Sequence, residues 1–509
     1  MLYAKLSHYW VSCGGTGNNN IYLELPILLV IFFTLYTPTL GKYKNTLLAL
    51  TSVYALYILY DIFYHFLAKS PRPGDLSNIT VLSDFSLPMS FGLFIMTLLI
   101  LLPLLYVTYH LYRHSQKRTF YTLSALKLFV IAGLVYYINT PYFTNKFNYL
   151  VWSQARTIKK NGRIASFIYY GMMSKRAKKK LAAYQKAPID VDTLLFNNTE
   201  IKQKRNIYIV VLESFIDPRL IQDATFSRSP LAKALKPFLI NEQFSLIKSP
   251  VYGGGTAQPE FEILTGVKAL ARVDSIEFNV LQGRQISGFV HALKKNGYST
   301  HATIATYSGY YNSKDAYKSI GFDTIRFLEE SSDFSRREGD RKIFDGDLYD
   351  DNIAALKRKT FHRPYLNYVL GMYGHFPYDR NLKLRPDVIT VTHKDPRVRR
   401  ITNQFYYRTK ALAKYINQIL ALDPTAIIFV SSDHIPPIIS KDIKYVKSQF
   451  ENIALLLVGG KTIDINHYHQ YDIPRIIWKR LTDDQSALQA IDDKTYETIY
   501  FKTLSKGLR

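Results

Sequence analysis

The first 140 residues of this 509-residue chain contain four long apolar stretches, and the remainder has the mixed composition of a globular domain. Each stretch approaches the roughly 20 residues that a helix needs to cross the hydrocarbon core of a bilayer. Because several are apolar on every side, transmembrane helices are favoured over buried core helices. The sequence predicts a transmembrane domain over residues 1–140 with about four helices, at 27–40, 47–67, 91–111 and 123–138.

The polar start of the chain, residues 1–20, lacks the pattern of a cleavable signal peptide, so we expect the apolar helices to target the protein to a membrane. Two short loops, between the first and second and between the third and fourth predicted helices, are basic. The positive-inside tendency places these loops in the cytoplasm and the large C-terminal domain outside it. The basic residues are Lys42, Lys44, Arg113, Lys117 and Arg118, whereas Lys69 and Arg72 fall in a loop that this orientation places outside.

The chain is strongly basic, with 65 Lys and Arg against 40 Asp and Glu and a net charge of +25. Beside a membrane, such a surface attracts anionic lipid headgroups, and the predicted spans make a nucleic-acid partner unexpected. Residues 141–204 mix aromatic and basic side chains, which is typical of helices at the lipid surface. A plain structured linker has the same composition, so both interpretations of this segment remain open.

Beyond residue 205 the sequence predicts an α/β domain with a mainly parallel sheet. The runs 206–212, 365–370 and 426–430 are apolar without polar alternation, as in strands that are covered on both faces. Polar residues follow each run: Glu213 after the first, His375 shortly after the second, and Asp433 with His434 after the third. Since ligands bind beyond the carboxyl ends of parallel strands, we expect these side chains to meet at one edge.

A glycine-rich turn places a single hydroxyl before a predicted helix, in the sequence Gly253-Gly254-Gly255-Thr256-Ala257. Glycines let the backbone approach a ligand closely, and the amino end of a helix favours an anion. Glu213, Asp433 and His434 offer carboxylate oxygens and an imidazole nitrogen, a set suited to zinc or manganese. A hydroxyl beside such an ion is an activated nucleophile. Taken singly, the same residues also fit helix caps and turns.

Four motifs resemble, in order and spacing, the sulfatase-like domain of the lipoteichoic acid synthase family, which includes phosphoglycerol and phosphoethanolamine transferases. The motifs are Val-Leu-Glu-Ser-Phe at 211–215, Gly-Gly-Gly-Thr-Ala at 253–257 with Glu-Phe-Glu at 260–262, Gly-His-Phe-Pro-Tyr at 374–378, and Ser-Ser-Asp-His at 431–434. The likeness covers residues 205 to about 480. It implies an alkaline-phosphatase-like fold in an extracytoplasmic catalytic domain, residues 205–509, of a multi-pass protein in the bacterial inner membrane.

The resemblance also implies a reaction and a set of site residues. Thr256 would take a phospho-alcohol headgroup from a membrane phospholipid and pass it to an envelope glycan, such as lipopolysaccharide core or a periplasmic glucan. One divalent metal ion would be bound by Glu213, Thr256, Asp433 and His434, and His375 would contact the substrate.

The headgroup itself is left open by one departure from the family pattern. Tyr311 fits the place of a substrate-binding aromatic residue, but Ser313 stands where members that handle glycerol phosphate have an arginine. The neighbouring Lys314 lacks the planar fork that grips a phosphate in two places. Phosphoethanolamine and phosphoglycerol therefore both remain candidates. A hydrolase on the same scaffold, a phosphodiesterase or sulfatase, is the alternative, although the single cysteine, Cys13, lies outside the domain.

Overall fold

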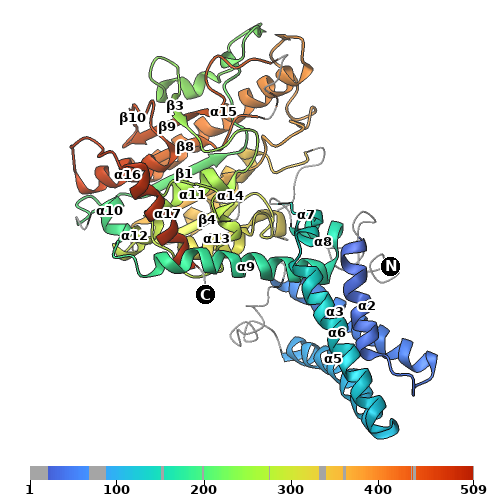
Figure 1. The fold of residues 1–509 in the computed structure, drawn as a ribbon. Coiled ribbons are helices and arrows are strands. Elements are labelled where there is room, and N and C mark those ends of the chain that lie inside the picture. Colours follow the sequence, from blue (N-terminus) through green and yellow to red (C-terminus); the bar gives the residue numbers. More distant parts are fainter. Residues whose placement is uncertain are drawn as a thin grey trace. The chain divides into compact units, whose positions relative to one another are not determined.

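The computed structural model describes residues 21–67, 71, 87–150, 154–197, 200–273, 276–331, 340–358, 363–436, 438 and 443–507 (Figure 1). The described residues do not include the polar start of the chain, residues 1–20, which contains Cys13. They also do not include Lys69 and Arg72 of the predicted outside loop. The chain divides into two compact units, Met1–Ala177 and Lys178–Arg509, and the division falls within one helix.

The first unit is helical. Its elements are α2 (Ile21–Leu35), α3 (Lys42–Leu67), α5 (Leu87–His114), α6 (Lys117–Asn139), α7 (Pro141–Lys146), α8 (Gln154–Asn161) and the first part of α9 (Arg163–Gln185). Among the described residues, three helices are long and apolar enough to cross a bilayer: Lys42–Ile62, Phe94–His114 and Lys117–Asn139. These correspond to three of the four expected spans.

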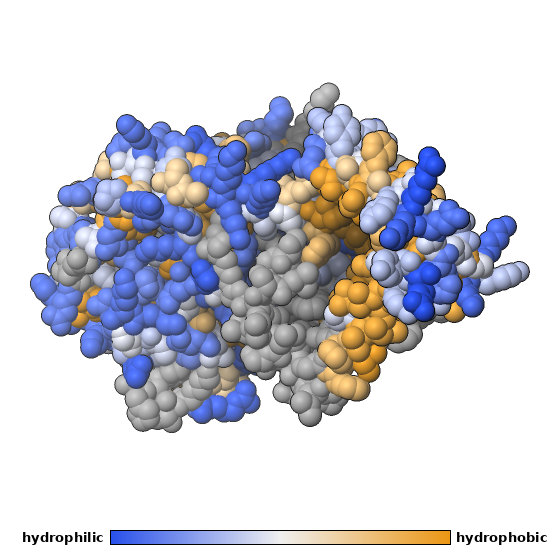
Figure 2. Space-filling model, turned by 60° about the horizontal axis from the view of Figure 1, so that its bottom comes forward, coloured by the Kyte–Doolittle hydropathy of each residue, from blue (hydrophilic) through white to orange (hydrophobic). Residues whose placement is uncertain are grey.

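The first expected span differs, because α2 has 15 residues within the part of the chain that the structure describes, which begins at Ile21. At 1.5 Å per residue its described length is about 22 Å, against a hydrocarbon core of roughly 30 Å. Leu23–Leu35 is accordingly a shorter apolar helix. Figure 2 shows hydrophobic residues gathered over the N-terminal helices, while the drawn surface of the second unit is mostly hydrophilic.

Two buried acids of the first unit contact the start of α9. Arg163 at the start of α9 donates from Nε to Asp61 Oδ1 of α3 at 2.6 Å, and both side chains are almost fully buried. Glu24 of α2 accepts a hydrogen bond from the Ile164 amide at 2.8 Å. These contacts join the start of α9 to α2 and α3 within this unit.

The second unit is built on one mixed sheet with the strand order β10-β9-β8-β1-β6-β4-β5, and β3 pairs with β9. The pairs β8–β1, β1–β6, β6–β4 and β4–β5 are parallel, whereas β9 is antiparallel to its neighbours. The strands are β1 (Ile207–Leu212), β3 (Ser245–Lys248), β4 (Ser299–Ile304), β5 (Thr324–Phe327), β6 (Tyr365–Gly371), β8 (Ile427–Ser432), β9 (Glu451–Val458) and β10 (Lys461–Ile463). A small separate pair joins β2 (Thr225–Phe226) to β7 (Val391–Thr392).

Helices cover both faces of this sheet. Successive residues of a strand point to opposite faces, and neighbouring residues of β6 contact different helices. On β6, Asn367 hydrogen-bonds to Asn352 of α14, whereas the next residue, Tyr368, donates to Glu260 of α11. Every residue of β1, β6 and β8 is buried, as expected for strands covered on both sides. The helices are α10 (Val191–Phe196), α11 (Ala257–Thr265), α12 (Phe289–Lys295), α13 (Ser313–Ile320), α14 (Asp345–Arg358), α15 (Pro396–Leu422), α16 (Ile473–Thr482) and α17 (Asp493–Gly507). The predicted α/β class with a mainly parallel sheet is confirmed.

Candidate metal and nucleophile site

Two neighbouring parallel strands deliver the acidic residues of the site. Leu212, the last residue of β1, is in register with Ser432, the last residue of β8, so Glu213 and Asp433 follow at adjacent positions. The Asp433 amide donates to the Leu212 carbonyl at 3.2 Å, which continues the strand pairing to this point. The expected meeting of strand ends is thus produced by register alone.

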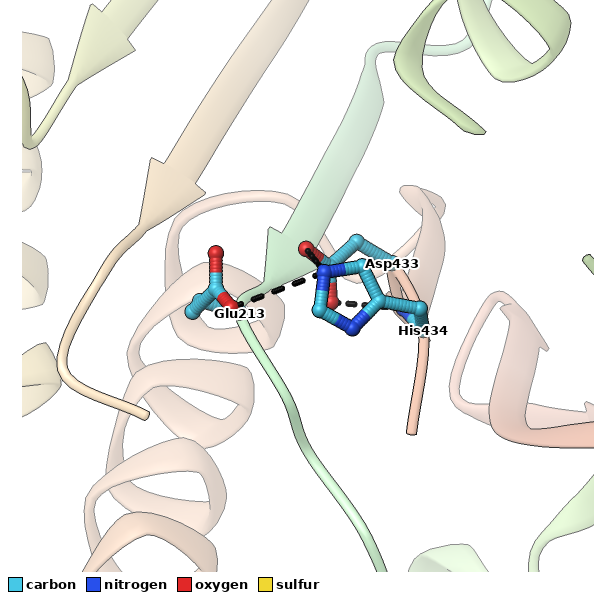
Figure 3. Close-up of side chains that lie close together, drawn as sticks. All are labelled: Glu213, Asp433 and His434. Carbon is cyan, nitrogen blue, oxygen red and sulfur yellow. Dashed lines mark hydrogen bonds and ion pairs between the residues drawn. The ribbon is translucent and has the colours of Figure 1, made fainter. Parts of the chain in front are cut away.

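Glu213, Asp433 and His434 converge, and one potential ligand atom from each lies within 4.8 Å of the others. Their side chains point toward one another (Figure 3). His434 Nε2 is 3.3 Å from Asp433 Oδ2 and 3.6 Å from Glu213 Oε1. All three residues are buried, so the cluster lies away from bulk water.

The tautomer of His434 is set by its other ring nitrogen. Nδ1 lies 3.0 Å from the Ile435 carbonyl, which can only accept, so Nδ1 carries the proton. In the neutral ring, Nε2 then presents a lone pair toward the two carboxylates. Burial opposes a charged ring, but Asp433 and Glu213 outweigh it and raise the pKa of His434, so a proton at Nε2 competes with a cation for this position. Both Nε2 and Asp433 Oδ2 are buried without a hydrogen-bond partner. Two orphaned acceptors that face each other fit a bound cation, and the oxygen and nitrogen donor set suits zinc or manganese.

Electrostatics within the cluster are strained without a cation. Burial, reinforced by the neighbouring Glu213 carboxylate, raises the pKa of Asp433 to about 7. For Glu213, burial acts in the same direction, but His434 and His375 outweigh it and lower the pKa of that carboxyl. Like charges at this spacing repel in a low-dielectric interior, which a divalent cation relieves.

The local backbone is held by short polar contacts around these acids. Ser214 adopts a positive φ of 49°, an unusual conformation for a serine. Its amide donates to Asp433 Oδ1 at 2.8 Å and its hydroxyl to Glu213 Oε1 at 2.8 Å. Both interactions orient a carboxylate, which accounts for backbone strain at this position.

Thr256 stands at the amino end of α11, directly after three glycines with positive φ. Gly253, Gly254 and Gly255 have φ of 67°, 152° and 88°, a path that residues with a Cβ rarely follow. The Thr256 hydroxyl donates to Glu213 Oε2 at 3.2 Å, and the residue is 4% exposed. The hydroxyl therefore lies beside the cluster and at the positive end of a nine-residue helix.

The two residues expected to contact substrate lie at the margin of the cluster. His375 is partly exposed, and its Nδ1 lies 2.9 Å from the Phe376 carbonyl. Tyr311 is buried, has a positive φ of 51°, and interacts with the Gly255 backbone. Burial, with the Tyr310 and Glu213 groups adding to it, raises the pKa of Tyr311.

Ser313, where an arginine was expected, has a structural contact. It begins α13, is 3% exposed, and its hydroxyl donates to the Tyr310 carbonyl. The neighbouring Lys314 is exposed.

Arg408 was not anticipated from the sequence. It is 2% exposed on α15, donates from Nε to Asp345 at 2.6 Å, and donates from Nη1 to the Glu213 carbonyl at 3.0 Å. Asp345 begins α14 and belongs to this ion pair. A charged residue in an otherwise apolar stripe of a long helix is the signal that could have revealed it.

Glu260 forms a second unanticipated network one turn along α11 from Thr256. Its carboxylate accepts hydrogen bonds from the hydroxyls of Tyr317 and Tyr368. Burial raises the pKa of Glu260 to about 8, although the two tyrosines oppose the shift. The network ties the first turn of the helix to α13 and β6.

A hydroxyl at a helix amino end, beside buried carboxylates and a histidine, is suited to transfer of an anionic group such as phosphoryl or sulfuryl. Comparison with known proteins agrees with this class of site. The chain belongs to the sulfatase family, whose model matches residues 205–501. The predicted sulfatase-like domain is therefore confirmed.

Curated relatives match part of this chain. A protein of Rhizobium meliloti (strain 1021) named "Putative cyclic beta-1,2-glucan modification protein" is 25% identical over 296 residues, 57% of this chain and 45% of the relative. An uncharacterized protein of Haemophilus influenzae is 26% identical over 195 residues, 36% of this chain and 35% of the relative. The matches thus span less than half of the length of either relative.

Solved structures show distant likeness. The phosphoglycerol transferase GacH of Streptococcus pyogenes, in complex with sn-glycerol-1-phosphate, is 16% identical with a TM-score of 0.47, over 66% of this chain and 91% of that one. The periplasmic domain of EptC from Escherichia coli, in complex with Zn, is 15% identical with a TM-score of 0.35, over 54% and 77%. Family membership rests on the sequence match and not on these likenesses.

Proposed function

We propose that this protein is a membrane-anchored transferase that moves a phospho-alcohol headgroup, phosphoethanolamine or phosphoglycerol, from a membrane phospholipid to an envelope glycan. The observation that carries the proposal is the Thr256 hydroxyl, 3.2 Å from Glu213 at the amino end of α11. The three candidate membrane helices support a membrane phospholipid as donor, because they would hold the enzyme at a bilayer. The name of the Rhizobium relative supports a glucan as acceptor.

Glu213, Thr256, Asp433 and His434 are the residues that would hold one divalent ion. When bound, the ion lowers the pKa of the threonine hydroxyl and offsets negative charge on the phosphate oxygens. The chain's own contribution is to aim the donors. Ser214 and Ile435 fix the two carboxylates and the imidazole, while the three residues before Thr256 are glycines and carry no side chain.

The reaction proceeds in two displacements. In the first, Thr256 Oγ1 forms a bond to the lipid phosphorus, the bond from phosphorus to the glycerol oxygen of diacylglycerol breaks, and the threonine proton ends on that oxygen. In the second, an acceptor hydroxyl forms a bond to phosphorus, the phospho-threonine bond breaks, and the acceptor proton returns to Thr256. His375, which is partly exposed beside the cluster, holds the headgroup, and the ring of Tyr311 contacts the same headgroup.

The test is transfer by the full chain in proteoliposomes that contain phosphatidylethanolamine and phosphatidylglycerol, each with a labelled headgroup, and a soluble periplasmic-type glucan. We expect the glucan to gain the mass of one headgroup. Thr256→Ala should abolish the gain, whereas Thr225→Ala, an exposed threonine on β2, should not change it. Release of free ethanolamine phosphate or glycerol phosphate with an unmodified glucan would establish the hydrolase alternative instead.

A further inference from the structure

A tight turn shortly after His375 exposes two leucines on either side of a lysine. Leu382 is 62% exposed and Leu384 is 48% exposed, and Lys383 between them is also exposed. Single exposed leucines are ordinary, but two on one short turn with a cation between them form a compact amphipathic tip. We call residues 381–385 the leucine turn.

The leucine turn is rigidly built. The side-chain oxygen of Asn381 accepts from the Lys383 amide at 3.0 Å and the Leu384 amide at 3.2 Å, an Asx-type turn. The Arg385 amide donates to the Asn381 carbonyl at 2.8 Å and closes the turn. The exposed leucines are therefore held outward by a formed backbone structure.

A buried ion pair forms the base of the turn. The Arg385 guanidinium pairs with Asp340, and the two side chains are 7% and 2% exposed. Asp340 also accepts from the Asn381 amide and the Tyr373 hydroxyl, both at 2.9 Å. Arg385 lies over the Phe344 ring at 4.0 Å. The exposed leucines therefore stand on a base that is buried and held by several polar contacts.

The turn belongs to the catalytic edge of the sheet. It follows β6, whose carboxyl end adjoins Glu213, and Tyr373 in its base lies two residues before His375. One short segment, residues 375–381, therefore links the leucine turn to His375, the residue that we propose holds the headgroup.

The chemistry of the tip favours a lipid surface as partner. Leucine side chains offer no hydrogen bonds to a glycan, whereas they bury well at the boundary between headgroups and acyl chains. A lysine between them can extend to the lipid phosphates. A chain with three candidate membrane helices has a bilayer at hand, and its net charge of +25 favours anionic headgroups.

We propose that the leucine turn inserts Leu382 and Leu384 into the bilayer, with Lys383 at the phosphates, and so draws a donor phospholipid toward His375 and Thr256. The insertion is independent of turnover. Only the part that makes the inserted lipid the donor rests on the proposed transferase function.

Insertion is measured on the full chain in nanodiscs of phosphatidylethanolamine and phosphatidylglycerol. With Cys13, the single cysteine, replaced by serine, Leu384→Cys carries an environment-sensitive fluorophore. The matched control is Leu422→Cys, which is similarly exposed at 46% and lies at the end of α15, before the amino end of β8 and hence at the opposite edge of the sheet. Spin-labelled lipids should quench the label at residue 384 and leave the label at residue 422 bright. Equal quenching at both positions overturns the proposal, as does a label at 384 that responds to added soluble glucan and not to lipid.

The donor role is measured with Leu382→Ser/Leu384→Ser. The mole fraction of donor lipid that half-saturates the enzyme should rise on the order of tenfold, since two leucines lose their apolar burial. Cleavage of a water-soluble nitrophenyl phosphodiester should be unchanged. An unchanged lipid dependence would contradict the donor role. Quenching at residue 384 without any headgroup transfer would instead refute the proposed function and leave insertion established.

Discussion

Replacing Arg408 should separate a structural contribution from a catalytic one. Arg408→Met leaves the fully buried Asp345 carboxylate without its partner. Breaking a buried ion pair in this way destabilises a protein by about 3–5 kcal/mol. At about 2–4 °C per kcal/mol for a domain of this scale, the melting temperature should fall by roughly 6–20 °C.

The double variant Asp345→Asn/Arg408→Met removes the stranded charge, so most of the melting temperature should return. Activity should not return, because the Glu213 carbonyl still lacks its 3.0 Å hydrogen bond from Arg408. A carboxylate misplaced by about 1 Å can slow a reaction by about 100-fold. We therefore expect turnover of a soluble phosphodiester to remain on the order of 10- to 100-fold below the native protein.

A matched control lies on the same two helices. Lys414 and Asp350 join α15 to α14 at 2.7 Å, but their side chains are 60% and 52% exposed. Lys414→Met should change stability by less than about 1 kcal/mol. The assays are melting of the full chain in nanodiscs and turnover at saturating metal. A double variant with native activity would refute the positioning of Glu213 by Arg408, and an unchanged melting temperature in Arg408→Met would refute the buried-pair argument.

Three further outcomes follow from the same site. Asp433→Asn should lose bound zinc or manganese, measured by metal analysis of the purified full chain, while melting shows that it remains folded; full metal occupancy would contradict the assigned ligand set. The folded-state pKa of Glu260, about 8, lies above the ordinary 4.5, so the stability of the native protein falls as pH rises from about 5 to about 9. Glu260→Gln should therefore gain stability relative to the native protein across this range, measured with a chelator present. A stability difference that does not depend on pH would show that the buried carboxyl is not the titrating group. Gly374→Ala should lose activity and stability together, since a Cβ there would collide with the Glu213 carbonyl and Arg408, and a variant with native melting and turnover would show that this close approach is not required.

The sheet and the meeting of the acids were predictable, because short apolar runs mark the strands and parallel strands bring the residues that follow them to one edge. Runs without polar alternation identify strands covered on both sides, and the register of β1 with β8 brings Glu213 beside Asp433. The number of membrane helices was less accessible. Apolar composition near residue 27 suggested a full span, whereas the described part of the chain shows a shorter apolar helix there, Leu23–Leu35.

The partners of the supporting residues were inaccessible for a different reason. Arg408 follows Glu213 by nearly 200 positions, and nothing local indicates that its guanidinium donates to that backbone carbonyl. The positive φ of Ser214 is likewise imposed by tertiary contacts with Asp433, because serine has no intrinsic preference for it. Long-range polar contacts therefore complete a site whose main residues local patterns already indicate.

The central claim is that Thr256 carries the transferred group. Its most direct test is peptide mass spectrometry of the full chain after incubation with phospholipid nanodiscs and metal, without acceptor glycan. The account predicts a headgroup mass on the peptide that contains Thr256, its removal when glycan is added, and its absence in Thr256→Ala. A headgroup on any other residue, or transfer to glycan by Thr256→Ala, would contradict the account.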